Sequence, residues 1–119
     1  MAVQKTDGLF TQTGESASDL RDKEFYFAKR DANGKFDLAG DGDSVVGVIS
    51  EGRNTTYHTS VNTKGNPILK AIAGSAITRG DSVQSDASGT AKTGSTNPVG
   101  TAINTVATGE YVEIDTDAS

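Results

Sequence analysis

The sequence contains no cysteine and no tryptophan, and it has one histidine and two prolines among its 119 residues. Without cysteine there is neither a disulfide framework nor a thiolate metal site. A catalytic triad of the serine hydrolase kind would have to be built around His58 alone, and no Gly-x-Ser-x-Gly turn supports one. The sequence therefore predicts a protein that is not an enzyme and that holds no metal and no cofactor.

Positive charge and long apolar runs are also scarce. The 11 Lys and Arg residues are scattered and are outnumbered by 16 Asp and Glu residues, for a net charge of −5. Clustered cations are what phosphates and anionic membranes attract, so we expect no nucleic acid and no membrane as partner. No stretch approaches the roughly 20 apolar residues of a membrane span. Residues 1–6 have no apolar run of the signal-peptide kind, so we expect synthesis in the cytoplasm.

Glycine, in contrast, is abundant, and its 14 residues separate short runs with alternating or β-branched side chains. Strands at spacings of roughly 8–12 residues are typical of a sandwich or barrel. The sequence thus predicts a small, all-β, single-domain sandwich or barrel, with a short stretch at 16–21 as its best helical candidate and a loop at 90–97. The expected strands are 24–28 and 35–38 (a hairpin), 44–50, 55–61, 67–73, 82–85, 99–106 and 110–114.

Turns are marked by Gly, Asn and Asp. Asn33 and Gly34 predict a type I′ hairpin turn, in which both residues have positive φ. The other turn positions that the sequence indicates are Gly74, Gly80, Asp81, Asp86 and Gly89. The Asp-Ala-x-Gly turn at 31–34 recurs at 86–89, and each copy precedes a Val-Gly pair, which indicates either a duplicated β-unit or a chance result of the composition.

The ends of the chain differ from its middle. We divide it into an N-terminal arm (1–22) that is partly disordered or ordered by a partner, a β domain (23–115) and a frayed tail (116–119). In the polar arm, Val3, Leu9 and Phe10 are candidates for binding a partner, or else they pack against their own domain. Only 34% of the residues are hydrophobic, so we expect the thin core to be helped by self-association or by docking.

Four segments carry a resemblance to a known family. Residues 68–83 read ILKAIAGSAITRGDSV, 85–89 read SDASG, 98–102 read PVGTA and 109–114 read GEYVEI. This pattern resembles the small tailed-phage proteins that are read as capsid decoration or cement proteins. Its Gly-Asp phrase also resembles β-clip domains of sugar-acid enzymes and pilus-assembly proteins, so the fold is expected to be β-clip-like or β-tulip-like.

The resemblance implies a structural protein of the virion exterior, which binds the outer surface of the major capsid protein, stabilises the shell and forms symmetric oligomers. Among these we favour a homotrimer over a dimer. Lys29 and Arg30 form either a solvated hairpin face or a contact with an acidic capsid patch. The alternative function is a carbohydrate-adhesion module displayed on the virion, in which polar loops at 51–56 and 90–97 would contact sugars. The aromatic faces that the chain offers for this are Tyr26, Tyr57 and Tyr111. A β-clip enzyme domain is the weakest hypothesis.

Acidic residues gather at Asp31, Asp37, Asp41 and Asp43, a spacing that invites comparison with a calcium loop. Counted from Asp31, an EF-hand loop would place an oxygen ligand at Lys35 and glycine at Phe36. The match fails, and the sequence predicts a solvated acidic loop.

Overall fold

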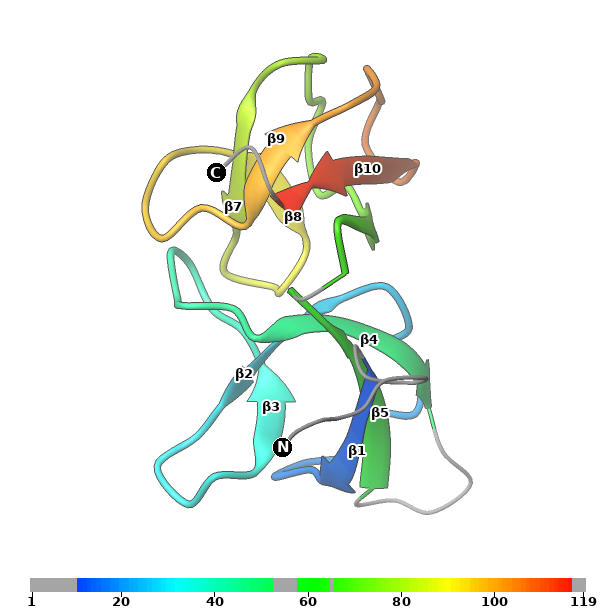
Figure 1. Ribbon diagram of the computed structural model, residues 1–119, viewed down its shortest axis with the longest axis vertical. Coiled ribbons are helices and arrows are strands. Elements are labelled where there is room, and N and C mark those ends of the chain that lie inside the picture. The colour runs from blue at the N-terminus through cyan, green and yellow to red at the C-terminus, as the bar shows by residue number, and fades with distance from the viewer. Residues whose placement is uncertain (1–10, 53–57, 65, 117–119) are drawn as a thin grey trace.

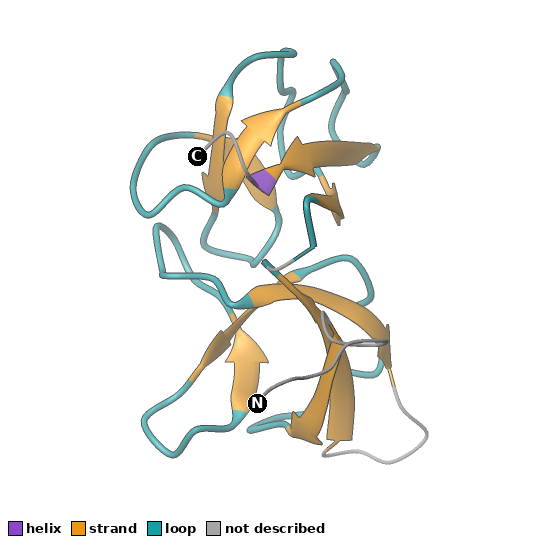
Figure 2. Ribbon diagram, in the orientation of Figure 1, coloured by secondary structure: helices purple, strands orange, loops and turns teal. Residues whose placement is uncertain are grey.

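The computed structural model describes residues 11–52, 58–64 and 66–116. In these residues the chain forms two five-stranded antiparallel sheets with almost no helix (Figures 1 and 2), which confirms the all-β fold class. Sheet A has the order β1-β5-β4-β2-β3, and sheet B has the order β6-β10-β9-β7-β8. The strands are β1 (Thr11–Glu15), β2 (Phe27–Arg30), β3 (Phe36–Leu38), β4 (Gly47–Gly52), β5 (His58–Thr63), β6 (Ile68–Ile72), β7 (Ser82–Ser85), β8 (Ala91–Thr93), β9 (Gly100–Ala102) and β10 (Tyr111–Asp115).

The hairpin expected at 24–38 is formed by β2 and β3, but the predicted type I′ turn is wrong. Gly34 has a φ of 78°, whereas Asn33 is not among the residues with positive φ. The Gly34 N–H donates to the Asp31 carbonyl, and the Asp31 N–H donates to the Lys35 carbonyl. This is a three-residue loop with a bulge at Gly34. The Asp31 carboxylate also accepts the N–H groups of Asn33 and Lys35 at 2.8 and 2.9 Å, so the loop is fixed without a second positive φ.

The second Asp-Ala-x-Gly turn repeats this arrangement. The Asp86 N–H donates to the Thr90 carbonyl, and the N–H of Gly89, at a φ of 83°, donates to the Asp86 carbonyl. The Asp86 carboxylate accepts the N–H groups of Ser88 and Thr90 at 2.8 and 3.0 Å. The two turns therefore share one hydrogen-bond pattern.

The two sheets are copies of one five-stranded unit. Each strand of sheet A has its counterpart five strands later, at the same place in sheet B. Lys29 pairs with Asp37 across β2 and β3. The residues 55 positions later in the chain, Gln84 and Lys92, pair in the same way across β7 and β8. The pairing of β4 with β5 recurs in β9 and β10 at a shift of 53 positions. The structure confirms the duplicated β-unit.

A glycine at the same place in each unit allows two strands to approach closely. A β-carbon on Gly47 would collide with the main chain of Asn62, and one on Gly100 would collide with the main chain of Asp115. Both colliding atoms belong to backbone, which cannot swing aside as a side chain can. The Val-Gly pair noticed in both halves of the sequence thus marks this contact between neighbouring strands.

The cores of the two units are built on equivalent positions. In β2, Phe27 and Ala28 are both fully buried. Because successive side chains of a strand point to opposite faces of the sheet, the two residues pack in different cores. Ala28 packs in the core of the first unit, whereas Phe27 packs with residues of sheet B, so the two units form one domain. The core of the first unit consists of Leu20, Ala28, Phe36, Ile49 and Val61. Their counterparts in the second unit are, in the same order, Ile77, Val83, Ala91, Ala102 and Ile114.

Some elements differ from expectation. Strand β1 was not predicted, because its sequence TQTGE is polar and mostly exposed; pairing with β5 holds it. Strand β8 lies in the stretch 90–97 that was expected to be a loop. Residues 16–21 form no helix, because Ser16 bridges to Phe36 and Leu20 is buried in the core. Since residues 1–10 and 117–119 lie outside the described residues, the division into arm, β domain and tail stays a prediction.

Within the part of the chain described above, no helix has the length and apolar character that crossing a membrane requires.

Candidate functional site

Exposed apolar side chains gather on one surface of the second unit. Among the described residues, the large hydrophobic side chains left exposed are Ile68, Ile103 and Tyr111, with exposed fractions of 53%, 36% and 47%. Side chains alternate along β6 and β10, so one set is buried and the other points outward. We define the outer face of sheet B as the outward residues of β6, β9 and β10 together with the outward residue after β9: Ile68, Lys70, Ile72, Thr101, Ile103, Tyr111, Glu113 and Asp115.

In the described residues of the first unit there is no equivalent exposed apolar surface. The counterpart of Ile68 in β1 is Thr11, and the counterpart of Ile103 is Ser50. Because both units have the same topology, the exposed isoleucines are not required by the fold. Exposed apolar patches on small proteins commonly mark sites of protein contact.

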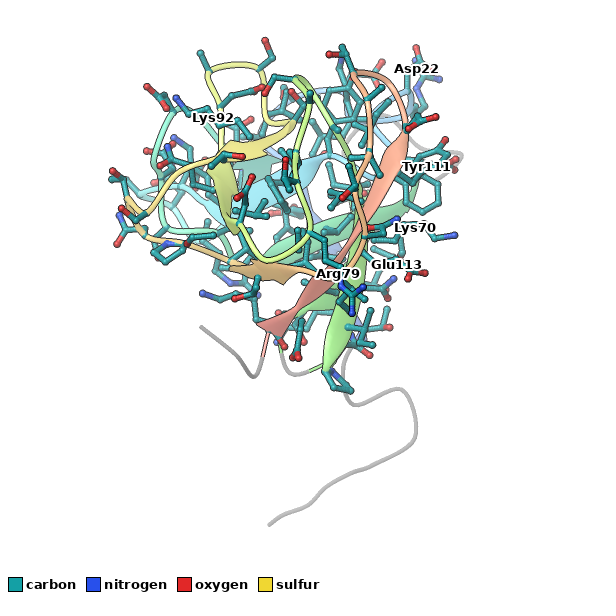
Figure 3. The ribbon with its side chains drawn as sticks, turned by 90° about the horizontal axis from the view of Figure 1, so that it is seen from above. Asp22, Lys70, Arg79, Lys92, Tyr111 and Glu113 are labelled. Atoms are coloured by element: carbon teal, nitrogen blue, oxygen red, sulfur yellow. The ribbon has the colours of Figure 1, made fainter. Side chains whose placement is uncertain are left out.

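Charged residues lie among these apolar ones. Lys70 on β6 is opposite Glu113 on β10. The Lys70 Nζ lies 5.8 Å from the centre of the Tyr111 ring, so its long side chain extends toward the aromatic end of the face. Figure 3 shows Lys70, Tyr111 and Glu113 on one side of the molecule and Lys92 on the other. Mixed apolar and charged side chains are typical of a surface that binds another protein reversibly.

At the end of the outer face of sheet B, a pocket of about 450 Å³ opens where the two units meet. The Ile72 N–H donates to the Phe25 carbonyl at 2.9 Å, which joins β6 to the segment before β2. The rings of Phe25 and Tyr111 pack with their centres 4.8 Å apart and their planes at 59°. The lining residues are Arg21, Asp22, Glu24, Phe25, Tyr26, Ile72 and Tyr111.

Two of the three tyrosines considered for the alternative saccharide function, Tyr26 and Tyr111, thus line one pocket. Tyr57 lies outside the described residues. The sequence did not indicate the pocket itself, because its walls come from three separate parts of the chain: residues 21–26, Ile72 and Tyr111.

One side of the pocket carries an ion pair. Arg21 donates from Nε and Nη2 to the two carboxylate oxygens of Asp19 at 2.9 and 2.7 Å. These hydrogen bonds from Arg21 lower the pKa of Asp19 to about 2, and the same contact raises the pKa of Arg21. The Arg21 charge is therefore matched within the chain, while Asp22 and Glu24 add two carboxylates to the lining. The Lys23 Nζ lies 5.0 Å from the centre of the Tyr26 ring, and the Lys70 Nζ lies 5.9 and 5.8 Å from the centres of the Phe25 and Tyr111 rings.

Phe25 has an unusual backbone conformation. Its φ is 70°, in the left-handed region that favours glycine, and its counterpart in the second unit is Gly80, with a φ of 93°. The two residues donate equivalent hydrogen bonds, from Phe25 to the Ile49 carbonyl and from Gly80 to the Ala102 carbonyl. A bulky residue held in this region costs roughly 1–3 kcal/mol, and such residues cluster at functional sites. The Phe25 ring packs against the core and against Tyr111, and this packing offsets the cost of the backbone conformation.

The hairpin cations have partners within the chain. The Lys29 Nζ contacts the Asp43 carboxylate at 3.0 Å, and this hydrogen bond raises the pKa of Lys29. Arg30 donates to the Gly34 carbonyl and to Gln12 Oε1, and its guanidinium lies 4.4 Å from the centre of the Phe36 ring. That Lys29 and Arg30 contact a capsid stays a prediction.

The three apolar residues predicted to bind a partner from the arm, Val3, Leu9 and Phe10, lie outside the described residues.

The remaining predicted turn residues hold the second unit together. The Asp81 carboxylate accepts the Thr78 N–H at 3.0 Å and the Thr93 hydroxyl at 2.9 Å. Gly74 is needed for space rather than for a positive φ, because a β-carbon there would collide with the side chains of Thr90 and Asp86.

The acidic loop uses its carboxylates in ion pairs. Asp41 contacts Lys92 at 2.9 Å, and Asp43 accepts the Gly40 N–H at 2.8 Å in addition to Lys29. In the described residues no group of three or more His, Asp or Glu side chains is placed to hold a metal ion. The side chain of His58 is not among those described, so the absence of a metal site and of catalysis stays a prediction.

Comparison with known proteins gives a consistent assignment. A search among curated proteins found no match. Among solved structures, the N base of the head fiber gp8.5 of bacteriophage phi29 has the same fold, with a TM-score of 0.67 and 19% sequence identity over 88% of this chain and 91% of that chain. The family described as phage cement protein matches residues 4–115, nearly the whole chain. The chain belongs to the phage cement protein family, whose members are structural proteins associated with the capsid.

Proposed function

We propose that this protein decorates the exterior of a phage capsid by placing the outer face of sheet B on the major capsid protein. The observation that carries the proposal is the position of Ile68, Ile103 and Tyr111, which are exposed on one face of one unit. Removing such apolar surface from water is a general driving force for association. The proposal extends the family assignment by naming the partner, the side of the shell and the contact surface.

Docking at the junction of neighbouring capsid proteins stabilises the shell through mass action. A ligand that binds only the assembled state adds RT ln(1 + [L]/Kd) to its stability at each site. Because a shell has many sites, a modest affinity at each of them gives a large total effect. The protein catalyses no reaction in this role, and it works in the virion after synthesis in the host cytoplasm.

Self-association would multiply these contacts. We favour a homotrimer at three-fold positions of the shell over a dimer at two-folds, since closed symmetric assemblies are the norm. The arm, with Val3, Leu9 and Phe10, would add a contact to a neighbouring subunit or capsid protein. Mass photometry of the free protein distinguishes trimer from dimer.

The test of the function compares complete phage particles with particles that lack the protein. We expect the depleted particles to lose infectivity and to release DNA at a lower temperature and on transfer to low salt. Adding back the purified protein should restore both tolerances. Depleted particles that survive heat and dilution as well as complete ones would refute the stabilising role.

A further inference from the structure

We infer that both ends of the two-unit molecule are closed to a second copy of the chain, so that copies do not add end to end. This property is independent of the proposed function, because it concerns the surfaces that another copy can use and not the shell. Since the two units share one topology, each surface at their junction has a counterpart at a free end of the molecule. The residues at these counterparts decide whether a further unit can dock there.

The two units meet through different surfaces. Two N–H groups of the first unit donate to carbonyls of the second, Phe27 to Gly89 at 2.7 Å and Gly42 to Ser85 at 3.0 Å. The donors lie at the start of β2 and in the loop after β3, whereas the acceptors lie at the end of β7 and in the turn before β8. A contact between two different surfaces can be repeated by further copies, into a ring or an open chain.

The free end of the second unit lacks the apolar residues that the first unit brings to the junction. The first unit contributes five side chains to the shared core: Phe25, Phe27, Ala39, Val45 and Val48. Their counterparts in the second unit are, in the same order, Gly80, Ser82, Gly94, Pro98 and Thr101. None of these five is buried, and none is aromatic or a large aliphatic residue. The burial of apolar surface that joins the units is therefore not available for a third one.

Main-chain donors at this end are left without the bonds of the junction. The counterparts of Phe27 and Gly42 are Ser82 and Asn97, and Asn97 has a φ of 48° where Gly42 has 69°. The Ser82 carbonyl accepts the Gly94 N–H, so the Ser82 N–H points to the same side of β7. Among the described residues, neither the Ser82 N–H nor the Asn97 N–H donates a hydrogen bond. These two groups report directly on whether another copy docks.

At the other end of the molecule, Arg30 takes the place of a preceding unit. In the second unit the Gly89 carbonyl accepts the Phe27 N–H at 2.7 Å. The counterpart of this carbonyl in the first unit belongs to Gly34, and it accepts Arg30 Nη1 at 2.7 Å. A guanidinium of the same unit thus occupies the acceptor that a docking copy would need.

The rest of this end is also polar. The Arg30 guanidinium lies 4.4 Å from the centre of the Phe36 ring and donates from Nη2 to Gln12 Oε1 at 2.6 Å, so it is held over the ring. Glu15 stands where the second unit has Ile72, a residue of the junction. Polar outer faces are what terminal units of repeat proteins need in order to end the array.

The first test measures amide hydrogen exchange in the native full-length protein by NMR, at high protein concentration. We expect the N–H groups of Phe27 and Gly42 to exchange at least about a hundredfold more slowly than those of Ser82 and Asn97. The comparison is valid for a monomer and for a trimer built through other surfaces, because only end-to-end contact would bond Ser82 and Asn97. Protection of these two groups equal to that of Phe27 and Gly42 would overturn the inference.

The second test opens one end at a time. The variant Ser82→Phe with Thr101→Val makes the second-unit end apolar, and the variant Arg30→Ser with Glu15→Ile removes the closure of the first-unit end. We expect each variant alone to have the mass of the native protein in light scattering, because its other end is still closed. An equimolar mixture of the two variants should form a complex.

The control mixes the Arg30→Ser, Glu15→Ile variant with native protein, which should give no complex. Circular dichroism verifies that each variant folds, and the exchange measurement on native protein decides the matter for a variant that does not. Folded variants that fail to associate when mixed, or that associate as strongly alone as in the mixture, would overturn the inference.

Discussion

Replacing the exposed apolar residues of the outer face should abolish most shell binding without unfolding the protein. The triple variant Ile68→Ser, Ile103→Ser and Tyr111→Ser changes side chains that are between about one third and one half exposed. Burying such a side chain completely contributes roughly 1.5–3 kcal/mol. Docking can bury only the exposed part, so each residue contributes about 1 kcal/mol and the three together about 2–3 kcal/mol. This corresponds to a Kd raised by a factor of roughly 30 to 150.

The assay is sedimentation of the purified protein with shells at a series of concentrations, with circular dichroism to verify the fold. The control changes two residues away from this face, the exposed Thr11 (Thr11→Ser in β1) and the partly exposed Lys92 (Lys92→Ser in β8). Thr11 is the counterpart of Ile68 in the first unit, so the control alters the equivalent edge of the other sheet. The reasoning is refuted if the triple variant folds and binds shells with an affinity close to that of the control.

Three further predictions concern the fold. Gly100→Ala should lower the free energy of unfolding by about 1–3 kcal/mol, because its β-carbon collides with the main chain of Asp115; thermal unfolding measures this, and an unchanged melting temperature would contradict the close approach. Asp86→Ala should cost about 1–3 kcal/mol, because the carboxylate accepts two N–H groups of its turn; urea unfolding that matches the native protein would show that the turn does not depend on them. The pKa of Asp43 lies below its usual 3.8, because the Gly40 N–H and the Lys29 ammonium donate hydrogen bonds to the ionised carboxylate. The contribution of Asp43 to stability is therefore present above pH 3.8 and is lost as the pH falls through the lowered pKa. Asp43→Asn should therefore lower the melting temperature at neutral pH and have less effect in strong acid, and an equal effect at both would exclude the ion pair as the cause.

Much of the fold could be predicted from local patterns. The apolar run at 67–73 predicts a strand, and β6 is found there. The recurring Asp-Ala-x-Gly turn indicated the duplication, because a hydrogen-bonded turn depends on a few adjacent residues. The turn type was predicted wrongly, since Asp31 fixes the loop through its carboxylate and the Asn-Gly pair does not decide it.

Other features could not be predicted locally. Strand β1 is polar, so its side chains do not mark it as a strand. The internal repeat does mark it, because Thr11–Glu15 lie 57 positions before the equivalent strand Ile68–Ile72. The pocket depends on bringing Phe25 next to Tyr111, which only the packing of the two units achieves. Nothing in the residues around Phe25 marks its positive φ, because that conformation is imposed by the bond from its N–H to the Ile49 carbonyl and by the packing of its ring.

The most direct test of the contact surface is an electron cryomicroscopy reconstruction of shells decorated with this protein, at a resolution that distinguishes the two sheets. We expect β6 and β10 to lie against the capsid protein on the outside of the shell, with Ile68 and Tyr111 buried and sheet A directed away from the shell. A map in which sheet A makes the contact, or in which the protein lies inside the shell, would contradict this account.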